Sequence, residues 1–354
     1  MSETVRPDGR HSWWIYQGTG RPLGDIDLME LLPPAPPWRV FDGEPPREAG
    51  PVPEDDRETD RRLGAARHLA ARLVDPHEVE MVNAALYLRR PLLVTGQPGS
   101  GKSSLAYRIA RELRLGRVLR WPIGSRTTVK DGLYGYDAIG RAQAAGARLS
   151  AAGDRTGAAD EPPIGEFVRL GPLGTAFLPR RLPRVLLIDE LDKSEADLPN
   201  DLLSLFEDGE FDIFELVRVR SRTPSVEVFT ADPDGTARIA KGRVRCCAFP
   251  IVVITSNGER DFPPAFLRRC LRYETKEPDA EQLAAIVAAH ALTSPETSRL
   301  IDEFLNRRRA VGGLPSDKLL DTIYLATSGA YRPDDESWPR VVDALWRQLN
   351  SPAR

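Results

Sequence analysis

The sequence has few cysteines, few lysines and no long apolar run. Its 354 residues include only three cysteines, too few for a disulfide framework, so we expect a reducing compartment. No stretch of 18 apolar residues occurs, which argues against a membrane-spanning helix. The first 20 residues lack the apolar core of a signal peptide. We therefore expect a soluble, cytoplasmic globular protein.

The chain also lacks an excess of charge of one sign. It has 49 Lys and Arg against 52 Asp and Glu, so the chain has no net positive charge. Its net charge therefore does not indicate a nucleic-acid partner. Its four histidines and three cysteines show no metal-ligand spacing, so we predict no metal site of that kind.

Proline density divides the chain. Ten of the 31 prolines lie in residues 1–60, which predicts an arm that is partly extended or disordered. The apolar segment 13–16 (WWIY) is interpreted either as packing on the following domain or as a partner-binding peptide. A helical pattern begins near Asp60 and continues to Leu86.

Short apolar runs then alternate with helical stretches, which predicts an α/β core with a parallel sheet over residues 61–277. Two inserts interrupt it. The insert near 136–165 is rich in Ala and Gly, and we expect a mobile tip; the insert near 211–245 predicts a β-hairpin. Residues 278–354 read as a helical lid, with Asp279, Ser294 and Ser316 as expected N-caps. The runs are 91–95, 118–121, 185–189, 251–255 and 271–274.

The strongest motif is the phosphate-loop pattern G-x-x-x-x-G-K-[ST], which lies between a predicted strand and a predicted helix. Glycines allow backbone amides to face phosphate oxygens, and the helix N-terminus adds partial positive charge. We expect Lys102 to reach the β- and γ-phosphates and Ser103 to bind Mg²⁺. The predicted nucleotide-binding residues are Gly96, Gln97, Pro98, Gly99, Ser100, Gly101, Lys102, Ser103 and Ser104.

Two carboxylates end the apolar run 185–188. A buried parallel strand brings Asp189 to the edge of the sheet where the phosphate loop also lies. Asp189 is therefore predicted to hold Mg²⁺, and Glu190 to orient and polarise the attacking water.

Four further residues are candidates for contact with the γ-phosphate. Asn257 follows the run 251–255 and can help to fix the attacking water, or can be a turn residue. Arg268 and Arg269, after Pro263 and Pro264, can stabilise phosphoryl charge, commonly from a neighbouring subunit, or can be surface cations. Lys318 can report the nucleotide state to the helical domain, or can be a solvated lysine of a first helical turn.

These motifs in this order resemble the AAA+ ATPases, and among them the MoxR-like branch. The resemblance runs from about Asp75 to the C-terminus and includes MVNAALYLRRPLLVTGQPGSGKS and GEFVRLGPLGTAFLPRRLPRVLLIDELDK. It implies Walker A at 96–103, Walker B at Asp189 and Glu190, and sensor 1 at Asn257. It places the arginine finger at Arg269, with Arg268 less certain, and sensor 2 at Lys318, where Arg is usual.

The resemblance further implies ATP as the nucleotide, a ring that is commonly hexameric, and a chaperone-like remodelling role. It also implies a protein partner that often carries a von Willebrand A domain. The inserts are longer than in simple members of the branch, and the Pro-rich arm has no counterpart there.

We consider three functions. The first is an ATP-driven remodelling motor or assembly chaperone, and the second is a slow nucleotide-operated switch within a larger complex. The third is a nucleic-acid-acting AAA+ machine, suggested by the Arg-rich stretches 217–222 and 241–245. Those stretches can instead be charged strand edges that discourage aggregation.

Overall fold

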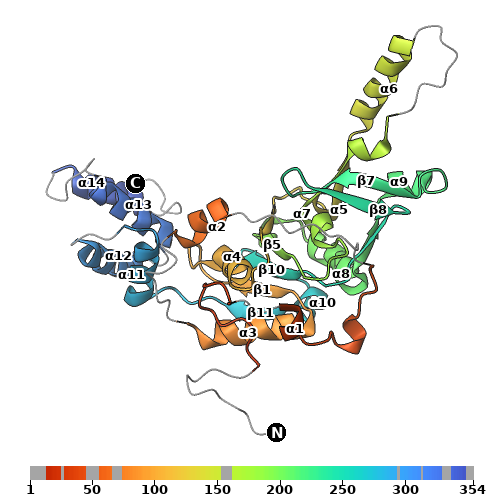
Figure 1. Ribbon diagram of the computed structural model, residues 1–354. Coiled ribbons are helices and arrows are strands. Elements are labelled where there is room, and N and C mark those ends of the chain that lie inside the picture. The colour runs from red at the N-terminus through yellow and green to blue at the C-terminus, as the bar shows by residue number, and fades with distance from the viewer. Residues whose placement is uncertain are drawn as a thin grey trace.

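A central sheet of five parallel strands forms the core of the structure, which is a computed structural model (Figure 1). All five predicted apolar runs form its strands, in the order β11-β1-β10-β5-β2, which confirms the parallel α/β core. The strands are β1 (Leu92–Thr95), β2 (Leu119–Pro122), β5 (Val185–Asp189), β10 (Ile251–Ser256) and β11 (Leu271–Glu274). The structure describes residues 13–24, 28–44, 56–65, 74–152, 162–292, 296–311, 314–328 and 336–347.

Successive side chains of the central strands enter two apolar clusters, one on each face of the sheet. Val94 and Leu187 pack on one face with α3 (Pro76–Leu88) and α4 (Lys102–Glu112). Leu186 and Ile188 pack on the other face with α7 (Pro172–Ala176) and α8 (Leu198–Asp208). Burial on both faces explains why β1, β5 and β10 are apolar up to their last one or two residues. The edge strands β2 and β11 have exposed residues at alternate positions.

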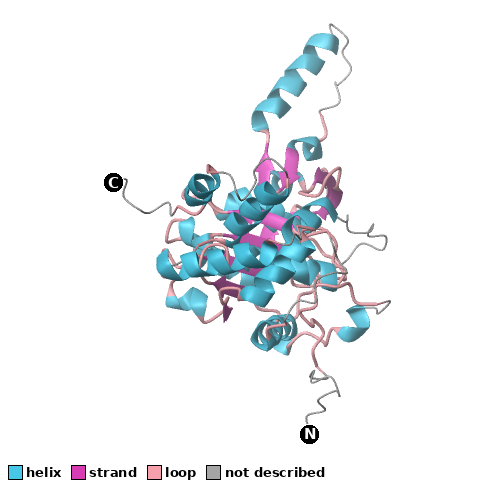
Figure 2. Cartoon of the chain, turned by 90° about the vertical axis from the view of Figure 1, so that its left-hand side faces the viewer, coloured by secondary structure: helices cyan, strands magenta, loops and turns pink. Residues whose placement is uncertain are grey.

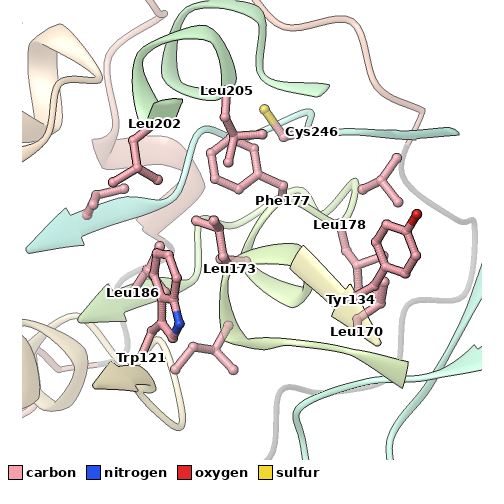
Figure 3. Close-up of a cluster of buried hydrophobic side chains, with 14 of the residues drawn as sticks. Trp121, Tyr134, Leu170, Leu173, Phe177, Leu178, Leu186, Leu202, Leu205 and Cys246 are labelled. Carbon is pink, nitrogen blue, oxygen red and sulfur yellow. The ribbon is translucent and has the colours of Figure 1, made fainter. Parts of the chain in front are cut away.

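A second sheet of six strands packs beside the first. Side chains from β2, α7 and α8 meet Tyr134 and Leu170 of the second sheet in one apolar cluster (Figure 3). The predicted hairpin is confirmed, since β7 and β8 pair antiparallel from Ser225–Ala240 to Phe229–Thr236. The strands, in sheet order, are β3 (Tyr134–Tyr136), β4 (Val168–Leu170), β7 (Ser225–Phe229), β8 (Thr236–Ala240), β9 (Arg243–Arg245) and β6 (Glu210–Asp212).

The Arg-rich stretch 217–222 does not form a strand edge, so that alternative interpretation is wrong for this stretch. It begins inside the short helix α9 (Phe214–Val219) and continues into a turn. Its backbone N–H groups bond within this local turn, for example from Thr223 to the Val219 carbonyl at 2.8 Å. These arginines therefore lie on a short helix and the turn after it, not on a strand edge.

The insert near 136–165 contains a helix, α6 (Ala138–Ala152), which projects away from both sheets (Figures 1 and 2). Its alanines explain the helix, because Ala has the highest helix propensity. The expected tip, residues 153–161, lies outside the described residues. The flanking elements are α5 (Val129–Leu133) and the 3-10 helix η2 (Ile164–Phe167).

Four helices at the C-terminal end form an apolar cluster of their own (Figure 1). Asp279 caps the first of them in a capping box with Gln282, as predicted. The Ser316 cap is wrong, because Pro315 occupies the N-cap position without a side-chain bond; Ser294 lies outside the described residues. The helices are α11 (Ala280–Ala289), α12 (Thr297–Val311), α13 (Ser316–Thr327) and α14 (Trp338–Leu345).

The N-terminal arm packs on α3 where it is described. The Asn83 side chain accepts hydrogen bonds from the backbone N–H groups of Ile15 (2.7 Å) and Tyr16 (3.0 Å) and donates to the Tyr16 carbonyl (2.7 Å). These contacts support packing rather than a free peptide for segment 13–16. The arm and the segment that follows it contain α1 (Leu28–Leu31), the 3-10 helix η1 (Pro37–Arg39) and α2 (Asp56–Leu63).

Candidate functional site

The loop between β1 and α4 has the backbone that its glycines predict. Gly96, Gly99 and Gly101 have φ values of 143°, 77° and 84°, which side-chain-bearing residues rarely adopt. Gly101 occupies the N-cap position of α4 without a side-chain bond, so no capping side chain occupies the N-terminus of the helix. Gln97 and Pro98 are exposed, and the Ser104 N–H donates to the Gly101 carbonyl at 3.1 Å. The loop is therefore shaped to hold an anion.

Lys102 lies over this loop. Its Nζ donates to the carbonyls of Gly96 and Gln97, both at 2.8 Å, although the side chain is almost buried. Burial lowers the pKa of the Lys102 ammonium, and the neighbouring carboxylates of Asp192, Glu190 and Asp189 oppose this effect. An ammonium held at the loop by neutral carbonyls can move to a bound phosphate.

Asp189 is the centre of the site. Its Oδ1 accepts hydrogen bonds from the Ser103 hydroxyl (2.7 Å) and the Thr255 hydroxyl (2.9 Å). Its Oδ2 accepts two from the Arg120 guanidinium, at 2.7 and 3.0 Å. Burial alone would raise the pKa of the Asp189 carboxyl, but the bonds from Ser103, Arg120 and Thr255 outweigh it and hold the pKa below its usual value.

Ser103 and Asp189 could hold Mg²⁺. Their side-chain oxygens are 2.7 Å apart, and hydroxyl and carboxylate oxygens are the hard ligands that Mg²⁺ prefers. This pair fits the magnesium site predicted from the sequence. The proposed ligands come from α4 and from the end of β5, which lie close together because α4 packs against β5.

Glu190 directly follows β5 and turns the chain sharply. Its φ of 63° is unusual for a residue other than glycine, and its N–H donates to the Thr255 hydroxyl at 2.8 Å. Its half-exposed carboxylate accepts a hydrogen bond from Lys193 at 2.8 Å. Thr255 therefore connects both acidic residues to β10, and the Glu190 side chain is left accessible.

Asn257 lies next to these acids because β10 and β5 are neighbouring strands. Its N–H donates to Asp192 Oδ2 at 2.8 Å, and the side chain is half-buried. The structure thus brings Asn257 into the same cluster as Asp189 and Glu190.

The N-terminus of α13 packs against the phosphate loop. A Cβ atom added to Gly99 would lie 2.5 Å from Pro315 Cα, so only glycine allows this approach. Lys318 is the third residue of α13 and therefore lies one turn from the contact. Ser100 meets the chain after β11 on another side, with 2.6 Å between its hydroxyl oxygen and that of Thr275.

Arg268 and Arg269 are at the end of α10 (Pro264–Leu267). Arg269 Nε donates to Glu207 Oε1 on α8 at 2.5 Å, and the Arg268 side chain is exposed. Within the described part of the chain, neither side chain contacts residues 96–104 of the same subunit. These two residues are therefore the predicted site residues that the structure leaves apart from the cluster.

Sequence reasoning missed Arg120, Thr255, Asp192 and Thr275. Arg120 is the second residue of β2, whereas the other three lie at or just after the carboxyl end of a central strand: Thr255 in β10, Asp192 after β5 and Thr275 after β11. Polar residues at that edge are expected near a ligand in an open α/β sheet, so their positions carried the signal.

An α/β core with a phosphate-binding loop and a strand-end acidic pair defines a P-loop nucleotide-binding protein. The model of the AAA domain (dynein-related subfamily) matches residues 91–270, about half of the chain, so the chain belongs to this family of AAA+ proteins. No curated protein matches the chain.

Among solved structures, the chain is similar to NtrX from Brucella abortus in complex with ADP. The identity is 12%, the TM-score is 0.33, and the match covers 84% of this chain and 60% of the other. The chain therefore spans less than two thirds of the length of that protein. None of the described helices is long and apolar enough to cross a membrane.

Proposed function

We propose that the protein is a Mg²⁺-dependent ATPase of the MoxR-like AAA+ branch that works as a ring-forming remodelling motor or assembly chaperone on a protein partner. The observation that carries this proposal is the hydrogen-bonded cluster of Ser103, Asp189, Thr255 and Glu190 beside the phosphate loop. ATP as the nucleotide, the hexameric ring and a partner with a von Willebrand A domain come from the resemblance of the sequence, and the cytoplasmic location comes from its composition.

The geometry of the site supports the proposed role of each residue. Residues 96–104 hold the phosphates through backbone N–H groups, and Lys102 moves from the loop carbonyls to the β- and γ-phosphates. Bound Mg²⁺, held by Ser103 and Asp189, would supply charge neutralisation at the phosphates. Glu190 accepts a proton from the attacking water, and Asn257 fixes that water.

Arg269, with Arg268 as its less certain neighbour, is proposed to act on the nucleotide of an adjacent subunit, where guanidinium charge stabilises the transferred phosphoryl group. Lys318 is proposed as sensor 2, and the contact of Pro315 with Gly99 supports a lid that responds to the nucleotide. We propose the division into an arm (1–60), a core (61–277) and a lid (278–354), with the inserts contacting the partner.

Replacement of Glu190 by Gln tests the proposal. We expect ATP turnover to fall by about 100-fold or more, because the water loses its proton acceptor. Binding of a non-hydrolysable ATP analogue should stay within about twofold, because the phosphate loop is unchanged. Glu195→Gln, an exposed acid nearby, is the matched control and should keep full turnover. Equal turnover of Glu190→Gln and wild type would refute the assigned role.

A slow switch is the second candidate, and its support is the projecting helix α6, which has the form of a partner-binding arm. Steady-state turnover of the assembled protein with its partner distinguishes the two. A rate far below about 1 s⁻¹ favours the switch, since typical enzymes exceed it.

A nucleic-acid-acting machine gains less support. Arg243 pairs with Asp212 at 2.8 Å, and Arg245 pairs with Glu210 at 2.5 Å and with Asp42 at 2.9 Å. These acids neutralise the arginines of the stretch 241–245 that suggested the function. The absence of detectable DNA or RNA binding near 50 mM salt, where electrostatic binding is strong, would exclude it.

A further inference from the structure

Asp192 is a buried acid of the cluster to which the proposed chemistry gives no role. It lies in the 3-10 helix η3 (Leu191–Lys193), which follows Glu190, and its exposed fraction is only 2%. Its Oδ2 accepts hydrogen bonds from the backbone N–H groups of Asn257 (2.8 Å) and Glu259 (3.0 Å). One carboxylate oxygen thus fixes the segment after β10 to the segment after β5.

The other oxygen of this carboxylate has no partner. Asp192 Oδ1 is buried and accepts no hydrogen bond from any described residue. Leaving a buried acceptor without a donor costs about 1–3 kcal/mol, and more for a charged group, so such an atom marks a place where a donor is missing. Among the neighbouring carboxylates, Asp192 does most to oppose the effect of burial on the pKa of Lys102, so it acts on the same lysine as Glu190 and Asp189.

The identity of the missing donor can be narrowed by chemistry. The triphosphate group of a bound nucleotide presents only oxygen acceptors when it is ionised, so it cannot donate to a carboxylate at neutral pH. Lys102 donates to the carbonyls of Gly96 and Gln97, and is expected to donate to phosphates when the nucleotide is bound. Mg²⁺ keeps several of its waters when it binds with phosphates, and these waters are hydrogen-bond donors.

We propose that Asp192 is a positioning residue whose Oδ2 holds the Asn257 segment and whose Oδ1 accepts a hydrogen bond from water that arrives with the magnesium nucleotide. This inference rests on the proposed function, and it adds a third acid to the pair read from the sequence. Asp192 then couples the presence of the metal to the position of Asn257 without touching the nucleotide itself.

The test measures how much Mg²⁺ strengthens the binding of a non-hydrolysable ATP analogue. In Asp192→Asn, the amide oxygen can still accept both backbone N–H groups, but an NH₂ group replaces the Oδ1 acceptor. We expect the ratio of dissociation constants without and with Mg²⁺ to fall by about tenfold or more, the size of a lost hydrogen bond to a charged group. The Mg²⁺-free dissociation constant should stay within about twofold of wild type.

Asp197→Asn is the matched control, because Asp197 is exposed and makes no capping bond at the start of α8. It should keep the wild-type ratio. Asp192→Ala is the second variant, since it removes the same acceptor without burying an amide, and it should lose the same Mg²⁺ effect. Thermal unfolding confirms that each variant is folded at the assay temperature.

Two results overturn the proposal. In one, either folded Asp192 variant retains the wild-type Mg²⁺ effect. In the other, analogue binding weakens equally with and without Mg²⁺. That result would mean that Asp192 Oδ1 accepts a hydrogen bond from Lys102 or has a purely structural role. Failure of the wild-type chain to bind the analogue at all is a different outcome, because it removes the proposed function and not this inference alone.

Discussion

The negative charge of the Asp189 carboxylate is balanced in this structure by the guanidinium of Arg120. Arg120 donates twice to Asp189 Oδ2, and the Arg120 side chain is 40% exposed, whereas the Asp189 side chain is almost buried. A buried carboxylate needs a partner, and here Arg120 supplies the positive charge that Mg²⁺ would supply in the nucleotide-bound site. Arg120 and the proposed metal would therefore act on the same group.

Arg120→Gln tests this relationship. Without nucleotide we expect the variant to lose about 1 kcal/mol of unfolding free energy, the low end for a weakened buried acceptor because Arg120 is partly exposed. Addition of Mg²⁺ with the ATP analogue should raise its melting temperature more than that of wild type, because the metal replaces the lost charge. Thermal unfolding with and without the ligand measures both effects.

Arg126→Gln is the control, since Arg126 is exposed and lies on the chain after β2. It should match wild type in both conditions. If Arg120→Gln gains no more from Mg²⁺ and the analogue than wild type does, Arg120 does not substitute for the metal charge.

The residues found from the sequence and those missed differ in one physical respect. Lys102, Ser103, Asp189 and Glu190 belong to local motifs whose spacing is visible along the chain. Arg120 and Asp189 are 69 residues apart, and Thr255 and Glu190 are 65 apart, so their contacts depend on which strands are neighbours. Strand order was not predicted, and these partners could not be assigned without it.

At the scale of elements, the hairpin β7–β8 is fixed to the first sheet by a buried ion pair. Arg184, directly before β5, donates to both carboxylate oxygens of Asp232 at 2.7 and 2.8 Å, and both residues are at least 97% buried. The Ala231 carbonyl accepts a further bond from Arg117 at 2.9 Å. The hairpin turn is thus attached to the strand that ends in Asp189 and Glu190.

Asp232→Ala should destabilise the protein by about 3–5 kcal/mol, because it leaves the Arg184 charge buried without a partner. Chemical denaturation measures the loss, and hydrogen exchange should show the largest increase in residues 225–240. Asp234→Asn is the control, because Asp234 is an exposed residue of the same turn with φ of 51°, which Asn tolerates. A change for Asp232→Ala no larger than for the control contradicts the anchoring role.

The same pair has a defined pH dependence. Burial alone would raise the pKa of the Asp232 carboxyl, but hydrogen bonds and charge from Arg184, with Arg180 and Arg117, hold it below its usual value of 3.8. Because the pKa is lower in the folded state, the stabilisation is fully present above the unfolded-state pKa. It is lost as the pH falls through the folded-state pKa. We therefore expect the difference between wild type and Asp232→Ala to shrink as the pH decreases below about 4.

Element prediction succeeded where burial on both faces made the pattern unambiguous. The central strands β1, β5 and β10 are continuous apolar runs up to their last one or two residues, and the edge strands β2 and β11 mix apolar and charged residues; each of the five was found within one or two residues. The second sheet was missed apart from its hairpin, because β3, β4, β6 and β9 are three residues long and come from distant segments. Strands that short have no detectable period, and pairing across the sheet stabilises them.

At the scale of the whole molecule, the proposed ring requires the Arg269 side chain to release Glu207 and to reach the nucleotide of a neighbouring subunit. Arg269 is held by Glu207 on α8, and both side chains are partly exposed, so the pair can open at low cost. A contact with a neighbouring subunit's nucleotide would replace this surface pair with a stronger one to phosphate oxygens. Arg269 therefore belongs to the subunit surface rather than to the site of its own chain.

Mixing of two inactive variants tests this arrangement. Arg269→Ala keeps Glu190 but lacks the arginine, and Glu190→Gln keeps the arginine but lacks the proton acceptor. Since an arginine finger contributes about 10³ or more to turnover, each variant alone should be nearly inactive. In a mixed ring, an Arg269→Ala subunit next to a Glu190→Gln subunit has one complete site, so turnover should rise well above that of either protein alone.

The mixture also separates the trans role from a structural one. If Arg269 only stabilised α8 through Glu207, Glu207→Gln would reduce turnover as strongly as Arg269→Ala, and mixing would give only the average of the two activities. Arg268→Ala, on the adjacent exposed residue, is the control and should hydrolyse ATP unaided if Arg269 is the finger. Native mass measurement with the ATP analogue and Mg²⁺ shows whether the subunits share one ring, which the recovery of activity requires.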